Sequence, residues 1–102
     1  MSEKDDSQTQ DRPTKPISVY DLIMVMTDQF AAIAWQKLGL QPDPMTGQVQ
    51  RDLVEAKVAI DLTSQLASFI QPRLEEEDQR QMHNLIRDLR INYVEKTKEE
   101  GA

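Results

Sequence analysis

The feature that most constrains the fold is an apolar-rich stretch over residues 19–38. Ser18 precedes it and Asp21 follows three places on, a spacing that resembles a capping box and predicts a helix start. Gly39 supplies the left-handed residue that commonly ends a helix. Apolar residues cover more than half of this helix, so one neighbouring helix would not cover them all.

Two apolar faces follow from the helical period of about 100° per residue. The face predicted to be core comprises Val19, Leu22, Ile23, Met26, Phe30 and Ile33. The second face comprises Tyr20, Met24, Ala31, Trp35 and Leu38. Met and Trp are suited to anchoring an interface and alanine permits close approach, so we predict that this second face mediates self-association, most simply as a symmetric dimer. The alternative is a monomer in which the other helices cover both faces.

Two more helices are predicted, over about 53–70 and 76–95. Asp52 and Glu55 repeat the capping-box spacing, and the break around Pro72 is short enough to make these two helices an antiparallel hairpin. The first of them carries a main apolar stripe and a second stripe of Val54, Val58, Leu62 and Phe69. Two stripes predict a central helix between two partners. The fold class is therefore all-α.

The two ends of the sequence are polar. Residues 1–16 hold no large apolar side chain after Met1, so we predict a disordered tail there. Residues 96–102 are equally polar and are predicted to fray. A single helical domain over 17–95 remains.

Charge and composition narrow the class of protein. With 12 basic and 18 acidic residues the net charge is −6, which opposes nonspecific binding to nucleic acid or anionic membranes. The chain has no cysteine, which fits a reducing cytoplasm, and its N-terminus does not read as a signal peptide. Asp21, Asp28 and Lys37 interrupt the most apolar stretch, which argues against a membrane span. A cytoplasmic protein with no membrane partner is expected.

No pattern of catalytic or metal-ligating residues is present in the sequence. His83 is the only histidine, and a solvent-facing role is favoured for it over that of a metal ligand or general base. The run from Glu75 to Asp78 fans around one helical turn, where it interacts favourably with the helix dipole. We therefore predict no enzyme activity, no catalytic, cofactor-binding or metal-binding residues, and no cofactor.

A basic stripe is predicted along the last helix, formed by Arg80, His83, Arg87 and Arg90. Such a stripe could contact phosphates or an acidic protein, which would make the chain an RNA- or ribosome-associated accessory factor. The favoured alternative is a solvated face with local ion pairs, namely Arg73 with Glu77 and Glu76 with Arg80.

The leading functional prediction from the sequence is a self-associating module that also presents a surface to a protein partner.

A series of short motifs resembles a known family. In chain order they are Leu38-Gly39, Pro42-Asp43-Pro44, Thr46-Gly47, Asp52-Leu53, Ala56-Lys57, Ile60-Asp61-Leu62, Asp88-Leu89-Arg90 and Tyr93-Val94. Their order and spacing resemble the bacterial family called domain of unknown function 1844, over about 19–95. The resemblance implies a small helical cytoplasmic protein and supplies no activity, so it carries over no catalytic residues.

Overall fold

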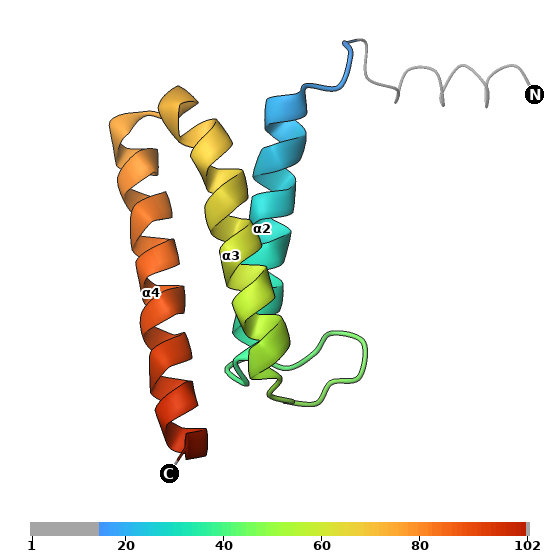
Figure 1. The fold of residues 1–102 in the computed structure, drawn as a ribbon. Helices are drawn as coiled ribbons and strands as arrows, with labels where there is room; N and C mark the ends of the chain where they lie inside the picture. The colour runs from blue at the N-terminus through green and yellow to red at the C-terminus, as the bar shows by residue number, and fades with distance from the viewer. Residues whose placement is uncertain (1–14, 102) are drawn as a thin grey trace, which may run out of the picture.

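The computed structural model describes residues 15–101, which form an all-α fold with three α-helices, as predicted (Figure 1). Helix α2 spans Val19–Lys37, α3 spans Leu53–Ile70 and α4 spans Glu76–Gly101, with a short 3-10 helix η1 at Gln71–Arg73. In Figure 1, α3 lies between α2 and α4, and it contacts both. The central position predicted for this helix is confirmed.

The first two helices begin where the side-chain caps predict. The Ser18 hydroxyl accepts a hydrogen bond from the Asp21 N–H at 3.4 Å, and the Asp52 carboxylate accepts one from the Glu55 N–H at 3.0 Å. Gly39 follows α2 with φ of 80°, the left-handed conformation expected of it. These signals act within one helical turn, so the sequence alone is enough to locate the helix starts.

A loop returns the chain from α2 to α3. The Gly47 N–H donates to the carbonyl of Asp43, four residues earlier, at 2.7 Å, which closes a turn around Pro44. The Asp52 N–H then donates to the Lys37 carbonyl at 2.8 Å, and Leu38 forms an isolated antiparallel bridge with Arg51. The end of α2 is therefore tied to the start of α3, and the two helices run antiparallel.

Small residues line the contact between α2 and α3. The buried residues of these two helices are Thr27, Ala31, Ala34, Ala56, Ala59, Ile60, Thr63, Ala67 and Ile70. Five alanines permit close approach of the helices, and each buried threonine hydroxyl donates to the carbonyl four residues earlier, at 2.7 Å. The hydroxyls are thus satisfied inside the core without a partner on the facing helix.

Helix α4 packs on one flank of α3 through a narrow apolar row. Leu89 belongs to the same buried cluster as Ile60, while Met82 belongs to a second cluster with Ala67. At the surface, Arg90 of α4 reaches Asp61 of α3 at 3.1 Å. The second apolar stripe of α3 is not part of this contact, because α4 sits on the opposite flank.

The end predicted for the last helix, near residue 95, was wrong. Helix α4 continues to Gly101, so residues 96–101, predicted to fray, are helical. Arg51 reaches the carboxylates of Glu99 and Glu100 at 3.1 and 3.8 Å, and Lys96 reaches Glu99 at 3.3 Å. Ion pairs with the loop thus support a polar segment that lacks an apolar face of its own.

The predicted N-terminal tail lies mostly outside the described residues, since only positions 15 and 16 of it fall within 15–101. Within that range, no helix combines the length and the hydropathy that a membrane crossing requires.

Candidate interaction surfaces

The face of α2 predicted as an interface is the face that packs on the rest of the molecule. Ala31 and Leu38 are 5% and 0% exposed and belong to the core. Trp35 and Met24 are half-buried and pack against the two buried clusters, and Tyr20 pairs with a side chain of η1. Ala31 and Leu38 are therefore unavailable to an interface, because the alanines on this face allow α3 to approach closely, whereas Tyr20 remains 45% exposed. For Tyr20, Met24 and Trp35 the interface stays a prediction.

The face of α2 predicted as core is largely exposed instead. Val19 is 66% exposed, and Leu22 and Ile33 are also exposed. Met26 and Phe30 are only half-buried. Several large apolar side chains of α2 therefore point away from α3, on a side that the described residues leave uncovered, while Trp35 packs against the core.

A matching row of apolar side chains is exposed on α3. It is the second stripe of the sequence prediction, in which Phe69 is 66% and Val58 is 55% exposed. Leu62 and Leu66, on the same flank, are half-buried. The stripe exists as predicted, but no helix among residues 15–101 covers it.

An ion pair shows that the two rows adjoin. Lys37 follows Ile33 by four residues and Glu55 precedes Val58 by three, so each continues one of the rows along its helix. Their side chains meet at 3.1 Å, which places both rows on one side of the α2–α3 layer. We call this side the uncovered apolar face and define it as Val19, Met26, Phe30, Ile33, Val58, Leu62, Leu66 and Phe69.

Helix α4 lies on the other side of that layer. Met24 and Asp28 of α2 line a hollow together with Asp78 and Leu85 of α4, and Asp61 of α3 pairs with α4 as described above. These positions occupy the flanks opposite the uncovered apolar face. The layer thus has one side covered by α4 and one side that no other part of residues 15–101 covers.

The charges of α2 and α3 follow the same division. Asp21 and Asp28 of α2 line hollows shared with η1 or α4, and Lys57 of α3 binds Asp61 at 2.9 Å on the α4 side. The uncovered apolar face is bordered by Lys37 and Glu55, whose opposite charges cancel. Hydrogen bonding to the Glu55 carboxylate raises the pKa of Lys37 above its ordinary value of 10.5.

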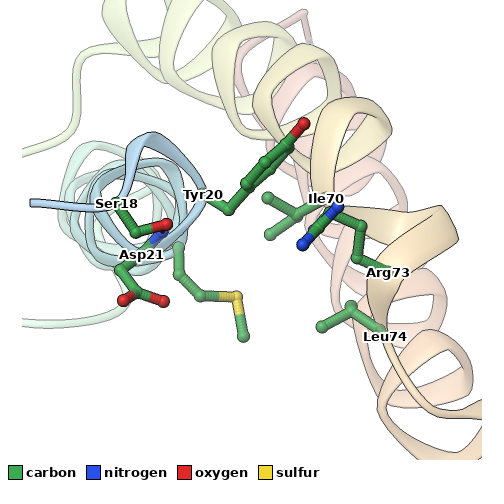
Figure 2. Close-up of a pocket in the computed structure, with 7 residues that line it drawn as sticks. Ser18, Tyr20, Asp21, Ile70, Arg73 and Leu74 are labelled. Atoms are coloured by element: carbon green, nitrogen blue, oxygen red, sulfur yellow. Dashed lines mark hydrogen bonds between the residues drawn. The ribbon is translucent and has the colours of Figure 1, made fainter.

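A small hollow of about 200 Å³ lies where the N-terminal turn of α2 meets η1. Figure 2 shows Tyr20 and Arg73 reaching toward each other across it, and the guanidinium lies 3.9 Å from the ring centroid. The Ser18 hydroxyl at its edge is used as the helix cap. The polar groups here hold α2 to the α3–α4 connection.

The acidic residues and the histidine of residues 15–101 do not form a metal site. No three side chains among His, Asp and Glu converge there in a way that could hold a metal ion. His83 is exposed on α4, and the acidic run before it lies around the first turn of that helix.

The basic stripe divides into two parts in the structure. Arg80 pairs with Glu77, while His83, Arg87 and Arg90 line a groove of about 400 Å³ between α3 and α4. The predicted local pairs were wrong in detail, since Arg73 stacks on a tyrosine and Arg80 bonds to Glu77 in place of its neighbour. The groove could not be predicted from the stripe, because it needs the flank of α3.

Comparison with known proteins gives a family and nothing narrower. A family model described as "Domain of unknown function (DUF1844)" matches residues 19–95, which include α2, α3 and most of α4. Neither the curated proteins nor the solved structures contain a match to the chain.

Proposed function

Because the chain belongs to the DUF1844 family, whose description assigns no activity, we propose a function from its surface: it is a non-enzymatic module that dimerises through the uncovered apolar face. The observation that carries the proposal is the position of that face, which unites two exposed apolar rows opposite α4. The lack of cysteine further favours a cytoplasmic setting.

The size of the face favours a second copy of the chain as its occupant. Helix α2 has 19 residues, which at about 1.5 Å per residue makes the face about 28 Å long, and two adjacent helices make it about 20 Å wide. Its footprint of about 560 Å², roughened by projecting side chains, approaches the roughly 800 Å² that each partner buries in a dimer of standard size. Exposed apolar patches of this extent commonly mark association sites.

Electrostatics also favour a second copy. The chain carries a net charge of −6, so two copies repel one another in most orientations. The uncovered apolar face brings only the balanced pair of Lys37 and Glu55 to its border, so that stacking it on itself adds no local repulsion. A two-fold axis through the face would place the same apolar rows against each other, as an isologous interface requires.

Sedimentation velocity at tens of micromolar tests the proposal. Phe69 is exposed, so Phe69→Glu leaves the core intact, yet it places a carboxylate inside the dimer interface. We expect the wild type to sediment as a dimer and Phe69→Glu as a folded monomer with unchanged helical circular dichroism.

The matched control is Ile91→Glu, which makes the same change at an exposed position on α4. It should remain a dimer. A monomeric wild type, or a dimer that Ile91→Glu dissociates and Phe69→Glu does not, would overturn the proposal.

A further inference from the structure

The groove between α3 and α4 combines cationic, polar and apolar groups. Its donors are His83, Arg87 and Arg90 from α4, with Ser64 and Ser68 from α3 facing them. Ala67, Met82 and Ile86 supply apolar surface between the two walls. The groove of about 400 Å³ thus offers charged hydrogen-bond donors beside apolar surface. A small anion would use the donors and leave the apolar surface without a partner.

A second hollow of about 450 Å³ continues this surface along α4. It is lined by Arg87, Arg90, Ile91, Val94 and Glu95, and so shares both arginines with the groove. Ile91 and Val94 are exposed. The two arginines therefore stand between two apolar patches, in a surface elongated along the helix.

We propose that this surface binds an acidic amphipathic helix of a partner protein. The apolar side chains of such a helix, spaced three or four residues apart, would contact Ile86 in the groove and the exposed pair of Ile91 and Val94. Its carboxylates would bind the guanidinium groups of Arg87 and Arg90 between them. Charge complementarity identifies the partner as acidic, and the apolar patches identify it as a folded amphipathic segment.

The same surface is poorly suited to RNA. Its lining includes no aromatic side chain on which a base could stack, and the exposed Ile91 and Val94 offer nothing to riboses or phosphates. The net charge of −6 also repels a polyanion at long range. This repulsion is stronger for RNA, with its many phosphates, than for a helix with a few carboxylates. An acidic protein helix satisfies the donors and covers the apolar patches together.

One internal group competes with the partner. Asp61 accepts a hydrogen bond from Arg90 at 3.1 Å, so part of the donor capacity of the surface is already used. Arg87 contacts the neighbouring Asp88 only at 3.4 Å from two of its nitrogens, a long and weakly held arrangement. Removal of the Asp61 charge should therefore strengthen binding of an external carboxylate.

The test selects ligands from a displayed library of helical peptides with randomised surfaces, using the full chain as bait, and measures a single-stranded oligouridylate in parallel. We expect the selected peptides to carry Leu or Ile at helical spacing flanked by Glu or Asp. Their addition should shift the NMR signals of His83, Ser64 and Ser68. Selection of neutral or basic peptides, shifts elsewhere on the molecule, or oligouridylate binding at the groove with no acidic peptide selected, each overturns the proposal.

Variants locate the interaction and separate it from dimerisation. Arg87→Glu with Arg90→Glu should weaken the selected peptide by about 10-fold or more, whereas Asp61→Asn should tighten it by about 2-fold to 5-fold. Lys98→Glu, which matches the charge change of each single arginine replacement and lies on the exposed end of α4, is the control and should leave affinity unchanged. Phe69→Glu should bind the peptide as the wild type does, since the uncovered apolar face lies on the other side. If the double variant and Lys98→Glu lose the same affinity for the peptide, the effect comes from overall charge, and the proposed site is rejected.

Discussion

Asp61 takes part in two charged contacts on the α4 side of α3. Its carboxylate lies 2.9 Å from the Lys57 ammonium and 3.1 Å from the Arg90 guanidinium. The hydrogen bond from Lys57, with further help from Arg90, holds the pKa of Asp61 below its ordinary value of 3.8. A carboxyl whose pKa is lower in the folded state stabilises that state when ionised and ceases to do so when protonated.

The stabilisation that Asp61 provides depends on pH. The contribution of Asp61 is present above its ordinary pKa of 3.8 and is lost as the pH falls through the lower, folded-state value. Asp61→Asn should therefore lower the free energy of unfolding at neutral pH, by less than about 1 kcal/mol since the side chain is screened by solvent. As the pH falls below the folded-state pKa of Asp61, the difference from the wild type should close. Urea unfolding of both proteins across this range measures it, and a difference that persists undiminished in acid would contradict the assignment.

The buried threonines show a second residue-scale effect. Thr27 and Thr63 are fully buried at the contact of α2 and α3, where the sequence predicts apolar side chains. Each hydroxyl bonds within its own helix, so its polarity costs little there, and its small volume suits the alanine-rich contact. Small side chains therefore occupy much of the α2–α3 contact, beside the half-buried Trp35.

At the scale of the elements, small side chains allow the close contact of α2 with α3. Ala34 is fully buried against α3, while Ala32, two residues earlier, is exposed. Replacing Ala34 by leucine should overpack the contact and lower the free energy of unfolding by about 1–3 kcal/mol. The same replacement at Ala32 should change it by less than about 0.5 kcal/mol, since both residues favour helices.

Chemical denaturation of the two variants in parallel measures this contrast. Both proteins must be compared at one concentration, because dimerisation would contribute to apparent stability. A larger loss for Ala32→Leu than for Ala34→Leu would mean that α2 is rotated from the orientation described.

The helices themselves were predictable and their mutual orientation was not. Ser18 and Asp52 fix helix starts through contacts three residues away, so a local pattern was sufficient. The end of α4 depends on Arg51, which is 48 residues from Glu99 in the chain, and no local pattern reveals that pairing. The groove beside Arg87 likewise needs Ser64 and Ser68 from another helix, so the basic stripe alone could only suggest half of it.

At the scale of the whole molecule, the two proposed surfaces do not overlap. The uncovered apolar face lies on the side of the α2–α3 layer away from α4, and the groove is formed with α4 itself. A dimer joined at the face would carry two grooves, both directed outward. Two outward grooves would give such a dimer two attachment points for acidic helices, and linked sites gain avidity where the partner can reach both.

The net charge of the chain predicts how salt affects the dimer. Each copy carries −6, so long-range repulsion opposes association, while the interface itself is apolar apart from the balanced pair of Lys37 and Glu55 at its border. Added salt screens the repulsion over a Debye length that falls from about 30 Å at 0.01 M to about 8 Å at 0.15 M. The dimer dissociation constant measured by sedimentation equilibrium should therefore decrease as salt rises through this range.

Phe69→Glu provides the control for this measurement, since it should remain monomeric at every salt concentration and so exclude general salting-out. A dimer held by ion pairs between copies would respond in the opposite sense, because salt would screen the attraction that joins it. If salt weakens the wild-type dimer, the interface lies on a charged surface and not on the uncovered apolar face. Helix α4 is the chief candidate for that surface, because its basic stripe and its Glu77, Asp88 and Glu95 are all exposed.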